Sequence, residues 1–311
     1  MGWEKKCPEF QLKHNHNETF KIREQIGHLL HEEFWNSKYC KQLNDVAMDA
    51  KRNVEGATFS IDDTFDLASR VQMQLDGKAI KVFDQVQSVM YKGRTLVSLR
   101  FTAGGAEAER KDVGEWLQEH ILKRPKPSST NKNLGQITIF TDDCCKHRNF
   151  YEGIFGKGVR VKLDRMHAFS RILKLLKPRT FQGNTRELFD IRDKIRYCGL
   201  PPEGKIRGGS SGSVGKEDFL IELNNLKKII PSKMLTSNVK KAIENLTLHY
   251  ECLADHSEIA SERGTNSNER VHRKCRGILP KTMTPVNATP LVRRFIAREN
   301  SATDNFPGNV Y

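Results

Sequence analysis

The sequence predicts an α/β fold built on a mixed β-sheet, in which three antiparallel strands precede alternating helices and strands. Residues 57–102 contain short β-rich runs separated by turn residues. Two later apolar runs, ITIF and VRVKL, are each followed by a segment with helical periodicity. Hydrophobic residues make up 37% and charged residues 29% of the 311-residue chain, which is typical of an ordered globular protein.

The first part of the sheet is expected from three antiparallel strands at roughly 57–66, 80–91 and 94–102. The turn pairs Asp76-Gly77 and Lys92-Gly93 separate these runs. A helix is expected at about 107–122, because Val113, Trp116, Leu117 and Ile121 recur at helical spacing. The same periodicity predicts helix before the strands.

The second part of the sheet is expected from two buried strands. The run from Gly135 to Thr141 ends at Asp142, and a helix at about 145–155 leads to the run Val159–Leu163. That strand ends at Asp164 and is followed by an amphipathic helix. Three antiparallel strands followed by alternating helix and strand is the element order of an RNase H-like fold.

The domain organisation follows from these patterns. The stretch 200–217 is rich in Pro, Gly and Ser and is expected to be a flexible loop. Beyond Pro280 apolar residues are sparse, and only a short helix at 289–298 is expected. The predicted parts are an N-terminal helical segment (1–55), the RNase H-like core (56–180), a helical insertion (181–262), a final Glu-bearing helix (263–280) and a C-terminal tail (281–311).

The charge balance favours a polyanionic partner. The formal net charge is +14, and residues 121–180 alone contain 14 basic and 4 acidic side chains. Phosphate contacts dominate the affinity of proteins for nucleic acids, so DNA is the expected partner. The alternative is a solvated basic face with no ligand.

The chain is expected to reside in the nucleus or cytoplasm and to avoid membranes. No apolar run approaches the roughly 20 residues of a membrane helix, and the start MGWEKKCPEF does not resemble a signal peptide. Seven irregularly spaced cysteines fit a reducing compartment. His and Cys cluster at 144–147, 249–256 and 272–275, but C-x₂-C pairs are absent, so we expect the adjacent Cys144 and Cys145 to pack in the core and not to bind zinc.

Acidic residues at strand positions are the candidates for chemistry. Asp62 lies within the apolar-flanked strand FSIDDTF, and Asp142 follows ITIF. A carboxylate in a buried strand is costly unless it is paired or binds a metal. Two divalent ions about 4 Å apart can catalyse phosphoryl transfer, and Mg²⁺ prefers carboxylate and water oxygens. The alternative is structural, because Asp142 can cap the next helix and Glu269 fits the N3 position of a capping box that begins at Asn266.

Four motifs resemble those of transposase-like sequences of the DDE, RNase H-like superfamily. The segments FSIDDTFDLA, ITIFTDDCCKHRNF, VRVKLDRMHAFSR and GTNSNERVHRK occur in this order over residues 55–275. They are similar to the patterns D-H-T-F, T-D-N-C-C, L-D-x-F-H-A-x-x-R and G-T-x-x-N-E-x-x-H found in animal genomes. Their layout resembles that of bacterial insertion-sequence and Mutator-like transposases.

The resemblance implies a catalytic and metal-binding triad of Asp62, Asp142 and Glu269, holding two Mg²⁺ or Mn²⁺ ions. It also implies accessory roles for Asp164 and His167, which match the L-D-x-x-H motif. Basic side chains near these motifs are expected to contact DNA phosphates: Lys146, Arg148, Lys162, Arg165, Arg171, Lys174, His272 and Arg273. Two positions depart from the pattern, with Asp63 in place of His and Asp143 in place of Asn. Both add negative charge next to the expected metal site.

Three functions are compatible with these patterns. The leading hypothesis is a DDE-type core that cleaves DNA and transfers strands through two-metal phosphoryl transfer, with a homo-oligomer among the expected assemblies. A second is an inactive, domesticated or fragmentary scaffold that binds DNA or protein, since residues 1–55 lack zinc-finger spacing and few residues follow the Glu269 helix. A third is an RNase H-type hydrolase or RNA-binding protein with the same fold and metals.

Overall fold

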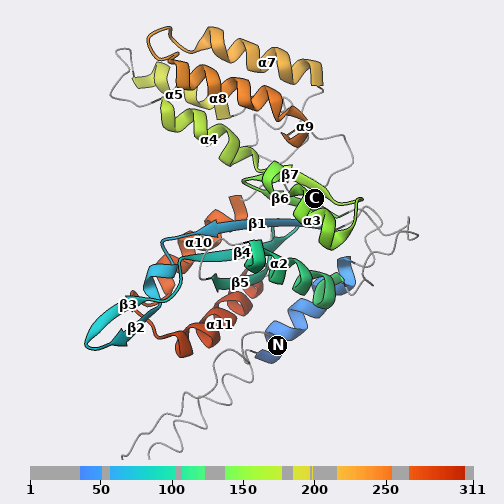
Figure 1. Ribbon diagram of the computed structural model, residues 1–311, viewed down its shortest axis with the longest axis vertical. Helices are drawn as coiled ribbons and strands as arrows, with labels where there is room; N and C mark the ends of the chain where they lie inside the picture. The colour runs from blue at the N-terminus through green and yellow to red at the C-terminus, as the bar shows by residue number, and fades with distance from the viewer. Residues whose placement is uncertain are drawn as a thin grey trace, which may run out of the picture.

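A five-stranded mixed sheet forms the centre of the computed structural model (Figure 1). The structure describes residues 36–50, 57–102, 107–122, 137–176, 185–196, 198, 216–253 and 266–304. The strand order is β5-β4-β1-β6-β7. The strands are β1 (Thr58–Thr64), β4 (Gln85–Tyr91), β5 (Thr95–Thr102), β6 (Thr138–Thr141) and β7 (Arg160–Leu163).

The pairing directions divide the sheet into two halves. Strand β1 pairs with β4, and β4 with β5, in antiparallel fashion. On its other edge β1 pairs with β6, and β6 with β7, in parallel. The prediction of an α/β fold with a mixed sheet is therefore confirmed. Helices α2 (Glu107–Trp116) and α3 (Cys144–Phe155) provide the crossover connections that parallel strands require.

The expected strand at 80–91 is divided in two. Residues Lys78–Lys81 form β3, which pairs with β2 (Gln72–Leu75) in a separate hairpin, and the sheet strand begins only at Gln85. Asp76 and Gly77 have φ angles of 51° and 75°, which suit a two-residue hairpin turn. All four residues of β3 are exposed, whereas all seven of β4 are buried. Only β4 therefore belongs to the main sheet.

Helices cover both faces of the sheet. Alternate strand residues point to opposite sides, and both sides present apolar side chains that the helices bury. On one face Phe59, Ile61 and Ile139 join a core with the helix at 36–50, α2, η2 (Leu117–Leu122) and α3. On the other face α10 (Asn266–Ile278) and α11 (Pro285–Asp304) pack with Val86, Met90 and other residues of β4 and β5. Asp62 alternates with Ile61 and therefore faces the α10 side.

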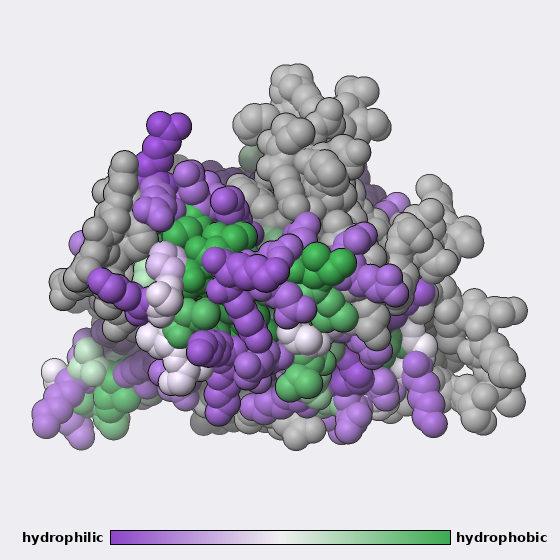
Figure 2. Space-filling view, turned by 90° about the horizontal axis from the view of Figure 1, so that it is seen from above, coloured by the Kyte–Doolittle hydropathy of each residue, from purple (hydrophilic) through white to green (hydrophobic). Residues whose placement is uncertain are grey.

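A helical region lies beyond the parallel half of the sheet (Figure 1). It contains α4 (Arg165–Leu175), α5 (Thr185–Arg196), α7 (Lys216–Ile229), α8 (Ser237–Leu248) and α9 (Tyr250–Leu253). Its apolar residues belong to the same core cluster as β6 and β7. Figure 2 shows apolar areas on this end of the molecule between hydrophilic side chains, and Phe189, Ile221 and Leu248 are exposed there.

The two ends of the chain differ in how far the structure tests their prediction. Helix at 36–50 agrees with the expected N-terminal helical segment, while residues 1–35 lie outside the described residues. Of the loop expected at 200–217, residues 200–215 also lie outside them, and Lys216 and Glu217 belong to α7 instead. Helix α11 spans 20 residues and is longer than the short helix expected at 289–298. Its Asn300 accepts from Leu96 N at 2.8 Å and donates to Leu96 O at 3.0 Å, so this segment is part of the fold. In the part of the chain that the structure describes, none of the helices has the length and apolarity to cross a membrane.

Candidate active site

The sheet register brings two of the predicted carboxylates to one edge. Strands β1 and β6 pair in parallel, with Thr58 opposite Thr138 and Ser60 opposite Phe140. Continuing this register by two residues sets Asp62 opposite Asp142. Neighbouring strands are about 4.8 Å apart, and residues in register point to the same face. The separation of 80 residues between the two aspartates therefore matches the offset of the strand pair.

Asp62 is a buried carboxylate with one unsatisfied oxygen. The residue is 4% exposed, and its Oδ2 atom accepts no hydrogen bond from the described residues. The pKa of Asp62 is raised to about 8, chiefly because the carboxyl group is buried; the charge of His167 lowers it, and the charges of Glu269, Asp164 and Asp142 contribute to the rise. A group in this state favours either a proton or a bound cation.

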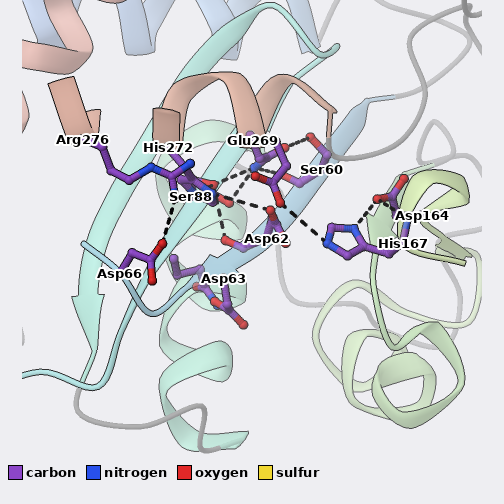
Figure 3. A network of polar contacts seen from close by, with 12 residues as sticks. Ser60, Asp62, Asp63, Asp66, Ser88, Asp164, His167, Glu269, His272 and Arg276 are labelled. Atoms are coloured by element: carbon purple, nitrogen blue, oxygen red, sulfur yellow. Dashed lines mark hydrogen bonds and ion pairs between the residues drawn. The ribbon is translucent and has the colours of Figure 1, made fainter. Parts of the chain in front are cut away.

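Two helices bring further metal-ligand side chains close to Asp62. One ligand atom each from Asp62 on β1, His167 on α4 and Glu269 on α10 lies within 4.8 Å of the others. Figure 3 shows Glu269 reaching toward Asp62 from α10 and His167 reaching toward it from α4, and His167 Nε2 lies 3.9 Å from Glu269 Oε1. The protein thus contains a possible metal-binding group at the predicted site.

Asp164 orients the His167 ring from behind. Its Oδ2 atom forms a short hydrogen bond with His167 Nδ1 and also accepts from the His167 backbone N at 3.3 Å. Asp164 is fully buried. This hydrogen bond raises the pKa of His167 to about 9, against an opposing effect of burial. A carboxylate on the far nitrogen is a common support for a metal-binding histidine, since it leaves Nε2 facing the site.

His272 lies inside the protein, beneath the carboxylates. It is 1% exposed, its Nε2 lies 2.8 Å from Ser88 Oγ, and its Nδ1 lies 3.7 Å from Asp62 Oδ2. Burial lowers its pKa to about 4, which keeps the ring neutral at physiological pH. The expectation that His272 contacts DNA phosphate does not fit this position, because helix α10 turns this side chain toward the sheet.

Asn268 was not identified as a site residue from the sequence, yet it fixes α10 on the sheet. It is fully buried and donates to Ser88 O at 3.0 Å and to Ser60 O at 3.3 Å, while Ser60 Oγ donates to Asn268 Oδ1 at 2.6 Å. Glu269 follows directly in the chain. The adjacent Asn and Glu of the final motif were the sequence signal that could have identified Asn268. In the structure Asn268 anchors α10 to the sheet, and Glu269 lies in the group of possible metal ligands.

Asp142 takes a looser place than the other two predicted acids. It is half-buried, and its carboxylate is outside the group formed by Asp62, His167 and Glu269. Its charge nevertheless raises the pKa of both Asp62 and His167. The backbone O of Asp142 accepts from Arg171 Nη2 at 3.0 Å. The structure therefore unites Asp62 and Glu269 with His167, with Asp142 within electrostatic range.

The two departures from the family pattern have polar partners of their own. Gln87 Nε2 donates to Asp63 Oδ1 at 3.2 Å, and Arg171 Nη2 donates to Asp143 Oδ1 at 3.2 Å. Both carboxylates are half-buried, and neither is among the grouped ligand atoms. These interactions hold the additional negative charges to the side of the site.

The basic residues expected to bind DNA fall into two sets. Lys146, Arg171, Lys174 and Arg273 are exposed. Arg148 instead donates to Cys252 Sγ at 3.2 Å, and Lys162 donates to Glu251 O at 2.8 Å, so both side chains reach α9. The side chain of Arg165 lies outside what the structure describes. Lys146, Lys174 and Arg273 are available to a polyanion, whereas Arg171 is already bonded to Asp142 O and Asp143 Oδ1.

Comparison with known proteins adds no relative to this description. No protein-family model matches the sequence. No curated protein matches it either. The geometry of the site and the resemblance of its motifs are therefore the guides to its function.

Proposed function

We propose that this protein is a transposase-derived phosphoryl-transfer core of the DDE, RNase H-like type that cleaves and joins DNA. The observation that carries the proposal is that ligand atoms of Asp62, His167 and Glu269, which come from three elements, lie within 4.8 Å of one another. One oxygen of the buried Asp62 carboxylate also lacks a hydrogen bond from the described residues. Helix capping alone leaves the position of Glu269 beside Asp62 unexplained.

The sheet topology supports this assignment. Numbered along the chain within the main sheet, the strands lie in the order third, second, first, fourth, fifth, with the first three antiparallel and the last two parallel. This is the layout expected of an RNase H-like fold. In such a layout the first and fourth strands are neighbours, so their acidic residues can share one metal site.

The residues present fit a divalent metal site. Asp62 and Glu269 offer carboxylate oxygens, and burial makes the Asp62 carboxyl group favour either a proton or a bound cation. His167 adds a nitrogen ligand, which suits Mn²⁺ better than Mg²⁺. Bound divalent ions would activate the attacking oxygen and stabilise the leaving oxygen of the phosphodiester.

The chain's own residues would divide the remaining work. Asp62, Glu269 and Asp142 would hold the ions, and Asp164 would fix the His167 ring. His272 and Ser88 would close the site from below and exclude water, because both are buried. Lys146, Lys174 and Arg273 would hold DNA phosphates, which positions the duplex without reading its sequence.

A nicking assay tests the proposal. Supercoiled plasmid is incubated with the full chain and Mg²⁺ or Mn²⁺, and the wild type is compared with Asp142→Ala and Glu269→Gln. Glu217→Gln on α7 is the matched control, because Glu217 is also exposed and lies on another helix. We expect metal-dependent nicking by the wild type and the control, and background nicking by the two site variants.

Other outcomes separate the competing functions. Cleavage of an RNA–DNA hybrid in preference to plasmid would favour an RNase H-type hydrolase. Nicking that persists in Asp142→Ala and Glu269→Gln would show that the activity belongs elsewhere. Specific DNA binding without cleavage, by the wild type as well as by the variants, would favour a non-catalytic scaffold and would refute the proposed activity.

A further inference from the structure

A second group of metal-ligand side chains lies where the sheet meets the helical region. Cys144 and Cys145 begin α3, His249 ends α8 and Cys252 lies in α9. One ligand atom from each of the four residues lies within 4.8 Å of the others. The two cysteines of α3 are more than 100 residues from the other two ligands, so only the folded chain assembles this group.

The two sulfur–sulfur distances match tetrahedral coordination. Cys145 Sγ lies 3.7 Å from Cys144 Sγ and 3.6 Å from Cys252 Sγ, and 3.1 Å from His249 Nδ1. Zinc–sulfur bonds of about 2.3 Å in a tetrahedron set the sulfur atoms about 3.8 Å apart. A disulfide would need about 2.05 Å, and all three cysteines are free.

The composition of the group favours zinc over the ions proposed for the carboxylate site. Three thiols and one imidazole form a Cys₃His set, which is common in structural zinc sites. Thiolates are soft ligands that bind Mg²⁺ poorly. Four protein ligands also complete a tetrahedron and leave no position for a substrate. Such a site stabilises structure and does not catalyse a reaction.

The surroundings suit a bound ion. Cys144 and Cys252 are buried, whereas Cys145 is exposed and gives the ion a route of entry. Zinc with three thiolates has a net charge of −1, and Arg148 Nη2 lies 3.2 Å from Cys252 Sγ, where its positive charge offsets this. Lys162 holds the α9 backbone by its bond to Glu251 O.

We propose that Cys144, Cys145, His249 and Cys252 bind one structural zinc ion that fastens the helical region to the sheet. On binding, the three thiols release their protons to solvent. Cys144 lies two residues after Asp142, so the ion would also fix the position of Asp142, which directly follows β6. The proposal is independent of the proposed activity, since a non-catalytic scaffold would need the same fastening.

Metal analysis of the purified full chain tests this site. We expect about one zinc ion per chain after dialysis against zinc-free buffer, as for a closed structural site. Cys145→Ser and Cys252→Ser should lose it. Cys40→Ser, at an exposed cysteine, and Cys198→Ser, at a buried one, are the matched controls and should retain it. Asp62→Asn should also retain it, which separates this site from the carboxylate group.

Cobalt substitution gives a readout that needs no variant. Cobalt bound by the wild type should show the visible absorption of a tetrahedral ion together with sulfur-to-cobalt charge-transfer bands in the near ultraviolet. Absence of those bands, or zinc retention by Cys145→Ser equal to that of the wild type, would overturn the proposal. A Cys145–Cys252 disulfide detected by mass spectrometry in the freshly purified protein would overturn it as well.

Discussion

Asp62 is a buried carboxyl group whose ionisation is opposed by its surroundings. Its carboxylate is 4% exposed, and one oxygen has no hydrogen bond from the described residues. Ionising such a group inside the protein costs free energy that ionisation in the unfolded chain does not. The folded pKa of about 8 therefore exceeds the unfolded value of about 3.9. The protonated carboxyl group makes its whole contribution to the free energy of unfolding below about pH 4, and this contribution is lost as the pH rises toward 8.

Asp62→Asn should remove this pH dependence. In magnesium- and manganese-free buffer near pH 8, we expect the variant to exceed the wild type in stability by a few kcal/mol, on the order implied by 1.36 kcal/mol per pKa unit. Added Mn²⁺ should raise the Tm of the wild type and leave that of the variant unchanged. Thermal melts over a pH series with Asp190→Asn, an exposed acid on α5, as control would check both effects. Parallel pH curves for wild type and Asp62→Asn would contradict the argument.

Asp164 should control the protonation of His167. The hydrogen bond between them is the main reason that the pKa of His167 is raised to about 9. The pair makes its whole contribution to the free energy of unfolding below about pH 6.5, the unperturbed pKa of histidine, and this contribution is lost as the pH rises through 9. In Asp164→Asn we expect the pKa of His167 to fall below that of the wild type by at least one unit, because burial then dominates. An NMR titration of the histidine ring measures it, with Asp84→Asn as control, and an unchanged value would refute the role of Asp164.

At the scale of elements, α10 is the part of the site that depends most on tertiary contact. Val271 and Cys275 pack with Met90 and Leu96 in the core of that sheet face, and Asn268 bonds to both β1 and β4. The helix thereby sets Glu269 beside Asp62. Lys274 also binds Glu299 of α11 at 2.6 Å, which ties the two helices of this face together.

Asn268→Ala should loosen α10. It removes donors to the buried carbonyls of Ser60 and Ser88, and each unsatisfied buried group costs about 1–3 kcal/mol. We expect a loss of about 2–4 kcal/mol in the free energy of unfolding, together with weaker metal binding. Urea denaturation measures the loss. Asn149→Ala, at an exposed asparagine of α3, should change it by less than about 0.5 kcal/mol. Equal effects of the two substitutions would exclude a specific anchor.

The elements that depend on local pattern were predicted best. Strands β1, β6 and β7, with helices α3 and α4, followed from period and turn residues. The division of residues 80–91 into two strands was not predicted, because β3 and β4 both contain apolar residues typical of a strand. Only their packing in the folded protein shows that β3 is exposed and β4 is buried. The place of His167 beside Glu269 and the inward direction of His272 depend on contacts more than 100 residues apart along the chain. Spacing along one segment holds no information on such contacts.

At the scale of the whole molecule, the carboxylate site lies where three parts meet. β1 supplies Asp62, the helical region begins with α4 and His167, and α10 on the far sheet face supplies Glu269. The proposed zinc site joins the same sheet edge to α8 and α9. The distance between His167 and Glu269 therefore depends on how the helical region packs against the sheet.

The excess of positive charge should make DNA binding strongly salt-dependent. Lys146 on α3 and Lys174 on α4 are exposed on elements that border the site. Changing both to Glu should weaken binding to all DNA sequences alike and reduce the slope of log K against log salt by about 2, roughly one per lost phosphate contact. Fluorescence anisotropy over a salt series measures this slope. Lys240→Glu with Lys241→Glu makes the same change in net charge on α8, a helix that supplies none of the grouped carboxylate-site ligands. An equal loss in both pairs would mean that net charge alone attracts DNA, whereas a loss confined to Lys146 and Lys174 would place the duplex over the carboxylates.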